Sequence, residues 1–254
     1  MNSDPSEVAV VILAAGLGTR MKSDKAKVLH EILGRPMISY VVDTAQAVAG
    51  KNLVLVIGHQ ADIVRKTVEA QVVDVQYAHQ EQQLGTGHAV MCAMSALPDR
   101  TRHVVVLCGD VPLLGKETLQ RFVDDHRTQD RTLSVLTVHL DDPTGYGRII
   151  RDNESNVTGI VEEADATPDQ KSLTLVNSGI YCVDRDFLET ALSQIRSDNA
   201  QGEYYLTDIV GVARQGNFRI GITIGGNADE FMGINSREQL EAVERMMRPI
   251  PDLN

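Results

Sequence analysis

A glycine-containing loop with two cations follows the first apolar stretch of the sequence. It reads LAAGLGTRMKSDKAK and runs from Leu13 to Lys27. Gly16 and Gly18 lack Cβ atoms, which lets the backbone approach a phosphate group and present N–H donors to it. Arg20 and Lys27 add positive charge in a protein whose net charge is −11. These residue types at this spacing predict a site that holds phosphate groups.

The loop matches neither of two common phosphate-binding motifs. Met21 stands where the third glycine of a dinucleotide-binding GxGxxG sequence belongs, and the GK[ST] ending of a Walker loop is missing. A GxG pair taken alone is more often a tight turn with surface cations nearby. The position directly after a buried strand, together with Arg20 and Lys27, favours the phosphate site over the simple turn.

An acidic residue ends another apolar segment. HVVVLCGD, residues 103–110, reads as a strand followed by Asp110. Ligands of open α/β sheets bind outside the carboxyl ends of the strands, so we expect Asp110 to face the same crevice as the glycine loop. A carboxylate there can hold Mg²⁺, which binds through one or two protein oxygens while substrate phosphates supply others. The alternative is a turn or capping aspartate before Val111-Pro112. The two segments together favour a triphosphate site.

Alternating strands and helices are expected to position these residues. Apolar runs predict strands at residues 8–13, 53–57, 72–77, 103–107 and 132–139. Helical patterns lie between them at residues 37–48, 60–70, 87–96 and 116–125. This alternation predicts an α/β fold with a doubly wound, mostly parallel sheet.

The pattern changes after about Asp141. Short strands are expected at residues 147–151, 157–161 and 175–183, and turn-rich sequence between them predicts a small antiparallel lobe. Helices are expected again at residues 184–195 and 236–247, with a strand at 218–224 between them. We expect a single domain over residues 1–254, with one lobe at about 1–140 and a second at about 141–235, closed by the C-terminal helix.

Composition argues against several classes of protein. The 254 residues are 43% hydrophobic and 23% charged, as in ordinary globular proteins, and the negative net charge disfavours nucleic acid or an anionic membrane as a partner. No apolar run approaches the roughly 20 residues of a membrane span, and the polar, acidic start MNSDPSE is unlike a signal peptide. The three cysteines are far apart and lie in apolar stretches, which predicts buried, unpaired residues of a protein in a reducing compartment; they are Cys92, Cys108 and Cys182. We expect a cytoplasmic protein.

Eight segments of the chain resemble the sugar nucleotidyltransferase family, most closely its N-acetylglucosamine-1-phosphate uridyltransferases. In order from residue 13 to residue 241 they read LAAGLGTRM, EQQLGTGHA, GDVPLL, DDPTGYGRI, GIVEEADAT, NSGIY, NAQGEYYLTDI and GINSREQLE. The resemblance implies a Rossmann-like nucleotidyltransferase fold whose antiparallel lobe binds the sugar. It also implies Mg²⁺-dependent transfer of UMP from UTP to N-acetylglucosamine 1-phosphate, giving pyrophosphate and UDP-N-acetylglucosamine, a peptidoglycan precursor.

The same resemblance assigns roles to individual residues. Those implied to contact the nucleotide are Leu13, Ala14, Ala15, Gly16, Gly18, Gln80, Gly85 and Thr86, the last three by reading the uracil. Those implied to bind the sugar are Gly147, Glu162, Asn177 and Tyr205. Mg²⁺ would be held by Asp110 and Asn235, with Arg20 and Lys27 as the catalytic cations.

Three features depart from the family pattern. Ala26 stands where the family usually has a proline before the loop lysine, and Cys108 stands where relatives often carry an aromatic residue, which leaves the sugar selectivity open. Bifunctional family members continue into a left-handed β-helix acetyltransferase, so this chain is either monofunctional or a truncated form. That β-helix trimerises the longer members and is not found in this sequence, so we expect a monomer.

The expected reaction needs no general base, because a sugar 1-phosphate is already an anionic nucleophile. Positioning and charge neutralisation are enough, and the metal, Arg20 and Lys27 would supply them. We therefore interpret His88 as a packing or capping residue. Glu162 and Glu163 are strand neighbours that point to opposite faces, so they do not form an acid–base dyad. Two alternatives stay open: another sugar phosphate or base, such as glucose 1-phosphate or dTTP, and a catalytically silent nucleotide-sugar sensor.

Overall fold

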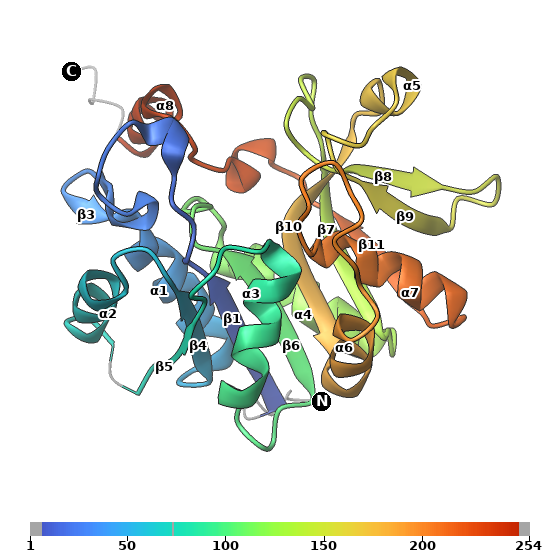
Figure 1. Ribbon diagram of the computed structural model, residues 1–254, viewed down its shortest axis with the longest axis horizontal. Helices are drawn as coiled ribbons and strands as arrows, with labels where there is room; N and C mark the ends of the chain where they lie inside the picture. Colours follow the sequence, from blue (N-terminus) through green and yellow to red (C-terminus); the bar gives the residue numbers. More distant parts are fainter. Residues whose placement is uncertain (1–6, 73, 249–254) are drawn as a thin grey trace, which may run out of the picture.

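A twisted central sheet organises the protein, and the computed structural model describes residues 7–72 and 74–248 (Figure 1). Within this part of the chain, the order of the sheet is β11 (Ile220–Ile224), β7 (Leu133–His139), β10 (Leu175–Asp184), β6 (His103–Cys108), β1 (Val8–Leu13), β4 (Leu53–Ile57) and β5 (Gln76–His79). Four of the six neighbouring pairs are parallel. The predicted α/β fold with a mostly parallel sheet is confirmed.

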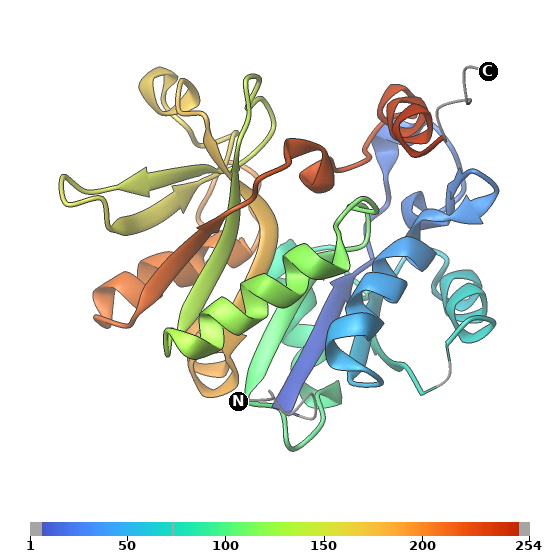
Figure 2. The ribbon, with the colours of Figure 1, turned by 180° about the vertical axis from the view of Figure 1, so that it is seen from behind.

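Helices cover both faces of this sheet. The described helices are α1 (Met37–Ala49), α2 (Ala61–Glu69), α3 (Thr86–Ala93), α4 (Lys116–Thr128), α5 (Pro168–Lys171), α6 (Arg185–Leu192), α7 (Ile209–Gln215) and α8 (Arg237–Met247). The two views show α1 and α4 on one face and α3 and α6 on the other (Figures 1 and 2). A doubly wound sheet buries both of its faces in this way, which explains why its strands are apolar at nearly every position.

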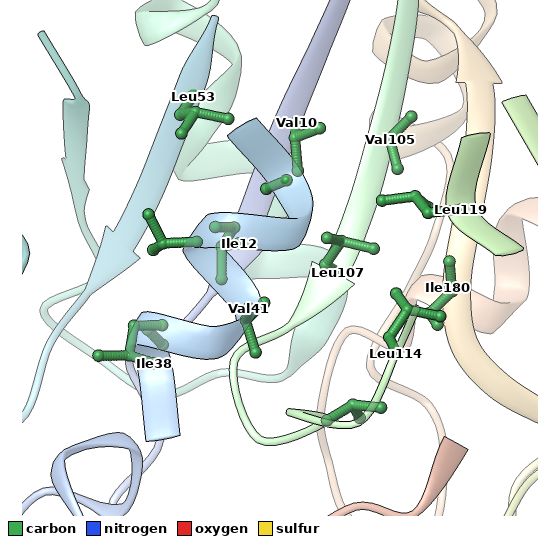
Figure 3. Packing of buried hydrophobic residues seen from close by; sticks show 14 of the residues in the cluster. Val10, Ile12, Ile38, Val41, Leu53, Val105, Leu107, Leu114, Leu119 and Ile180 are labelled. Atoms are coloured by element: carbon green, nitrogen blue, oxygen red, sulfur yellow. The ribbon is translucent and has the colours of Figure 1, made fainter. Parts of the chain in front are cut away.

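The inner strands carry the core on each face. Val10 and Ile12 of β1 alternate with Val11 and Ala9, so that the first pair packs under α1 and the second under α3. Figure 3 shows Ile12 beside Ile38 and Val41 of α1. Burial of this kind stabilises by about 25 cal/mol per Å² of apolar surface. The core therefore fixes the strand ends, and the strand ends carry the candidate site residues.

A small antiparallel hairpin projects from one side of the sheet. It consists of β8 (Arg148–Arg151) and β9 (Val157–Val161), and it joins the sheet where Arg148 pairs with Val176 of β10. Figure 1 shows the hairpin standing away from the parallel strands. The antiparallel lobe expected from the sequence is therefore present, although its boundaries stay a prediction.

The strand expected at residues 175–183 is present and pairs with the hairpin, but it is also part of the central sheet, which the sequence did not predict. These residues belong to β10, a ten-residue strand between β6 and β7 that is antiparallel to both. Pairing on both sides buries most of the strand and satisfies its backbone, which no hairpin strand in isolation achieves. β10 therefore belongs to both the sheet and the lobe, because it pairs with β6 and β7 and also with β8.

Several smaller features also differ from the expected pattern. β5 starts at Gln76 rather than at residue 72, and residue 73 lies outside the described residues. Two short helices, α5 and α7, were not predicted from the sequence. A small sheet of β2 (Glu31–Ile32) and β3 (Arg35–Pro36) packs against α8. The acidic start of the chain lies outside the described residues up to residue 6. In the part described, each helix is too short or too polar to cross a membrane.

Candidate active site

Two adjoining cavities open at the carboxyl ends of β1 and β6. The loop cavity, about 410 Å³, lies over the glycine loop and is lined by Leu13, Ala14, Ala15, Gly16, Leu17, Gly18, Thr19, Lys27, Val28, Gln80, Gln83, Gly85, Thr86, Ala89, Cys108, Asp110 and Glu203. The lobe cavity, about 250 Å³, lies against the antiparallel lobe and is lined among others by Arg20, Tyr146, Gly147, Glu162, Asn177, Tyr181, Thr207, Asn235 and Gln239. Leu13, Thr86, Cys108 and Asp110 line both, so the cavities share a wall.

Two glycines of the loop serve different purposes. Gly18 has a φ of +67°, and a Cβ there would lie 2.6 Å from Cβ of Lys27. Only glycine fits that contact and that left-handed conformation without strain. A Cβ on Gly16 would meet no atom within 4 Å. The bare backbone at Gly16 therefore leaves space in the cavity, whereas Gly18 packs the loop onto Lys27.

The second wall of the loop cavity is the turn that starts α3. Gly85 has a φ of +104°, and Gln80 donates from Nε2 to its carbonyl oxygen over 3.0 Å. The Gln80 side chain is buried, and its Nε2 also lies 3.0 Å from Nδ1 of His88. Thr86 accepts a hydrogen bond from the backbone N–H of Leu206 through Oγ1, over 3.1 Å. The turn is thus held rigidly in place, and His88 packs behind it as expected from the sequence.

The lobe cavity presents a half-buried carboxylate. Glu162 accepts a hydrogen bond from Thr207 over 3.1 Å. Burial raises the pKa of Glu162 above its ordinary value, although the hydrogen bond from Thr207 offsets part of that shift. Asn177 donates to the Tyr181 hydroxyl over 2.7 Å, and both residues line the cavity. A carboxylate can accept hydrogen bonds from the hydroxyl groups of a polyol, and the amide and hydroxyl groups around it can also donate to them.

Two cations and two oxygen ligands converge where the cavities meet. Lys27 forms an ion pair with Oδ2 of Asp110 and donates from Nζ to Oδ1 of Asn235 over 3.0 Å. Arg20 donates from Nη2 to the same Asn235 oxygen over 2.9 Å. The side chains of Lys27 and Asp110 are only 16% and 17% exposed, so solvent screens their charges weakly. The structure therefore brings together four residues from three distant parts of the sequence.

Asn235 is held against Asp110 by the start of α8. The backbone N–H of Ile234 donates to the carbonyl oxygen of Asp110 over 2.9 Å. Gln239 accepts from the backbone N–H of Asn235 over 2.7 Å and from that of Ser236 over 3.1 Å, as part of a capping box. These bonds fix the entry of α8, and with it the direction of the Asn235 amide.

The pair of oxygens fits a divalent cation. Oδ2 of Asp110 and Oδ1 of Asn235 already face a single positive centre, the ammonium of Lys27. Mg²⁺ commonly takes one or two protein oxygens and completes its coordination with phosphate oxygens and water. The donor set and its convergence suit that mode of binding, and the adjoining cavities leave room for phosphates on either side.

Not every residue predicted for the site lines a cavity. Tyr205 is buried outside both linings, and its hydroxyl donates to Gln201 over 2.8 Å. Glu163 faces away from Glu162 and pairs with Arg148 over 2.8 Å. Burial raises the pKa of the Cys108 thiol to about 12, so this cysteine is a neutral group in the shared wall. The remaining predicted residues line one cavity or both.

Sequence reasoning missed several residues of the lobe cavity. The segments DDPTGYGRI, NSGIY and NAQGEYYLTDI contain Tyr146, Tyr181 and Thr207, but only Gly147, Asn177 and Tyr205 were predicted from them. The motifs carried the signal, since each missed residue lies within four positions of a chosen one. What the motifs did not give was the direction of each side chain.

Comparisons with known proteins show the family to which the sequence is similar. The sequence profile of the nucleotidyl transferase family matches residues 9–218. The chain is 48% identical over 242 residues to the bifunctional protein GlmU of Geobacter metallireducens, covering 95% of this chain and 51% of that protein. It is 46% identical over 240 residues to the bifunctional protein GlmU of Trichlorobacter lovleyi, covering 94% and 52%. The chain thus spans about half the length of these relatives.

One solved structure supports the fold assignment independently of close sequence similarity. It is a crystal structure of a protein assigned as a glucose-1-phosphate thymidylyltransferase from Bacillus anthracis, in complex with sucrose. The two folds superpose with a TM-score of 0.73 over 96% of each chain, at 20% sequence identity. At that identity the similarity concerns the fold alone.

Proposed function

This chain belongs to the nucleotidyl transferase family, and we propose that it transfers UMP from UTP to N-acetylglucosamine 1-phosphate in the presence of Mg²⁺. The products are UDP-N-acetylglucosamine and pyrophosphate. The observation that carries the proposal is the convergence of Arg20, Lys27, Asp110 and Asn235 on the wall shared by two cavities. The relatives named above support a reaction of this class, since the chain aligns with them over nearly its whole length.

The two cavities suit two different substrates. The loop cavity offers bare backbone at Gly16 and a rigid turn at Gly85, which suits a nucleoside triphosphate. The lobe cavity offers Glu162, Asn177 and Thr207, which suits the hydroxyl and amido groups of a sugar. The reacting phosphates would meet at the shared wall. This arrangement would bring an anionic nucleophile in line with the α-phosphorus, which is the main task of the reaction.

The chemical step is a displacement at the α-phosphorus of UTP. A phosphate oxygen of the sugar 1-phosphate forms the new P–O bond, and the bond to the bridging oxygen of the β-phosphate breaks. Pyrophosphate leaves with the electron pair of that bond, so the step needs no proton transfer. Lys27 and Arg20 hold and neutralise the phosphates while Asp110 and Asn235 orient the cations around them. Bound Mg²⁺ would neutralise further charge on the phosphate oxygens.

An assay of pyrophosphate release over a panel of substrates tests the proposal. Each of UTP and dTTP is combined with N-acetylglucosamine 1-phosphate and with glucose 1-phosphate, with and without Mg²⁺. The expected result is the largest kcat/KM for UTP with N-acetylglucosamine 1-phosphate, and no turnover after chelation of the metal. A larger kcat/KM for another pair would reassign the substrates but keep the reaction.

Binding measurements separate an enzyme from a sensor. If the chain bound UTP or UDP-N-acetylglucosamine tightly but released no pyrophosphate with any pair, a regulatory role would replace the proposed one. We expect turnover, because a sensor has no need of two cations and two metal-directed oxygens at the point where the phosphates meet.

A further inference from the structure

A second group of metal-binding side chains lies at the end of the sheet opposite to the two cavities. His103 is the first residue of β6 and is paired across the sheet with Asp184, the last residue of β10. His126 reaches them from the last turn of α4. Cys108 ends the same strand that His103 begins, so the strand rise separates this group from the active-site wall by about 17 Å.

The ligand atoms of this group have the spacing of a metal site. One atom from each of His103, His126 and Asp184 lies within 4.8 Å of the other two. Oδ1 of Asp184 is 3.0 Å from Nδ1 of His103 and 3.4 Å from Nε2 of His126. A tetrahedral zinc site with bonds of 2.0–2.1 Å separates its ligands by roughly 3.3 Å. Asp184 already has about this separation from both ring nitrogens, and the ring nitrogens lie within 4.8 Å of each other, so an ion could replace these hydrogen bonds once the imidazoles move closer together.

His126 is oriented for coordination by its other ring nitrogen. The side chain is fully buried, and Nδ1 lies 2.9 Å from Oγ of Ser134 on β7. When Nε2 binds a metal, the ring proton sits on Nδ1 and donates to the Ser134 hydroxyl. Metal-bound histidines almost always have such a partner, which fixes the ring and raises its basicity.

The group is accessible and its charge surroundings are balanced. The Asp184 side chain is 42% exposed and faces a cavity of about 640 Å³, which leaves space for water as a further ligand. Four arginines line the cavity, and their charge opposes a cation. Arg102 and Arg127 share Glu7 over 3.5 and 3.4 Å, Arg131 pairs with Asp125 over 2.6 Å, and Arg185 donates to backbone carbonyl oxygens. The lining also contains four carboxylates, Asp184 among them, which offset this positive charge.

We propose that His103, His126 and Asp184 bind a divalent transition-metal ion, for which Zn²⁺ is the probe. Two imidazoles and one carboxylate suit zinc and its neighbours in the first row, whereas Mg²⁺ prefers oxygen ligands alone. The ion ties β6, β10 and α4 together, so its effect is on stability and not on the reaction. The proposal is independent of the proposed function, because the cluster shares no residue with the two cavities.

Calorimetric titration of the metal-stripped chain with Zn²⁺, in excess Mg²⁺, tests the assignment. The wild type and Asp110→Asn are both expected to bind one Zn²⁺, because the active-site carboxylate is not a ligand. His103→Asn and Asp184→Asn should weaken binding by at least about 100-fold, and Ser134→Ala by roughly 10–100-fold. His139→Asn, which removes an exposed histidine elsewhere, is the matched control. Zn²⁺ binding that survives in His103→Asn and Asp184→Asn, or that is lost in Asp110→Asn, would overturn the assignment.

Two measurements on the wild type need no variant to fold. At Zn²⁺ near 100 times its dissociation constant, the melting temperature should rise by roughly 5–10 °C. Nuclear magnetic resonance of the histidine ring nitrogens should show shifts at His103 and His126 and none at His139. An unchanged melting temperature, or shifts confined to other histidines, would mean that the cluster is only a hydrogen-bonded packing contact between α4 and the sheet.

Discussion

The two cavities of the candidate active site are built in different ways. The loop cavity draws mostly on two short segments, residues 13–19 and 80–89, and offers backbone, glycine and alanine. The lobe cavity draws mostly on side chains from segments spread between residues 144 and 239, with a carboxylate, amides and hydroxyls among them. A surface made of backbone is specified by a short motif, whereas a surface made of side chains is specified by the fold. The first should therefore be sensitive to added bulk and the second to lost functional groups.

The largest expected effect is at the wall that both cavities share. Asp110→Asn removes a charge that pairs with Lys27 and would face the metal, while keeping the shape of the side chain. We expect kcat to fall roughly 10²–10³-fold, as when one preorganised electrostatic group is lost from a site of this kind. The dissociation constants of UTP and of the sugar phosphate should change only a few-fold, because the other lining residues of both cavities stay in place.

Steady-state kinetics and equilibrium binding measure these two quantities separately. Asp99→Asn, at an exposed aspartate away from the site, is the matched control and should behave as the wild type. Full activity of Asp110→Asn would remove the metal assignment and, with it, the argument that the two cavities meet at a metal.

The next effect distinguishes two glycines of the loop cavity. Gly18→Ala forces a left-handed conformation that costs about 1–2 kcal/mol and adds a methyl group against Lys27, so kcat/KM should fall roughly 10–100-fold. Gly16→Ala meets no protein atom, so it should leave the melting temperature unchanged and raise the KM for UTP alone. Thermal denaturation and kinetics of both variants test the contrast. Equal losses of stability in both would show that the loop is not packed as described.

The contrast between the cavities also explains how much the sequence could predict. The bounds of β1, β4 and β9 match the expected ones, since each is a short run with a clear apolar pattern. The bounds of β10 were predicted to within one residue. Its place between β6 and β7 was not, because that pairing joins residues about 40–80 positions apart and leaves no local sign. The same holds for the site. Asp110 was predicted from its place at the end of a strand and Asn235 by resemblance, and only the fold brings their oxygens to one point.

A further expected effect concerns the lobe cavity. Glu162→Gln keeps the shape of the side chain but removes the charge of the hydrogen-bond acceptor. Loss of a charged hydrogen bond costs about 1–2 kcal/mol, so the KM for the sugar phosphate should rise about tenfold. The KM for UTP should stay unchanged. Burial raises the pKa of Glu162, so its carboxylate becomes protonated at a higher pH than that of an ordinary glutamate. The wild type should therefore begin to lose affinity for the sugar phosphate at that higher pH as the pH falls. Glu162→Gln should lack that limb of the pH profile.

The neighbouring carboxylate supplies the control for this prediction. Glu163→Gln breaks an ion pair with the buried Arg148 outside the cavity, so it should lower the melting temperature but leave both KM values and the pH profile unchanged. A similar rise in the KM for the sugar phosphate in both variants would mean that the lobe as a whole has been disturbed, and that Glu162 has no direct part in binding.

The smallest expected effect tests whether α8 positions the shared wall. Gln239→Ala removes the acceptor for the backbone N–H groups of Asn235 and Ser236. Loss of such a cap costs about 1 kcal/mol, which corresponds to roughly a fivefold change. If the cap directs the Asn235 amide, this change should appear in kcat and in the Mg²⁺ concentration needed for half-maximal activity. A loss of helix stability alone would lower the melting temperature without altering the metal dependence.

Rescue by a conservative variant separates these outcomes. Gln239→Glu keeps an oxygen acceptor at the third helical position, where glutamate completes a capping box as well as glutamine does, so most of the lost activity should return. Gln215→Ala, at an exposed glutamine on α7, controls for loss of a glutamine side chain in general. If Gln239→Ala needs no more Mg²⁺ than the wild type, the helix cap does not position Asn235. The hydrogen bond from the backbone N–H of Ile234 to the carbonyl oxygen of Asp110, which this variant leaves intact, would then position it.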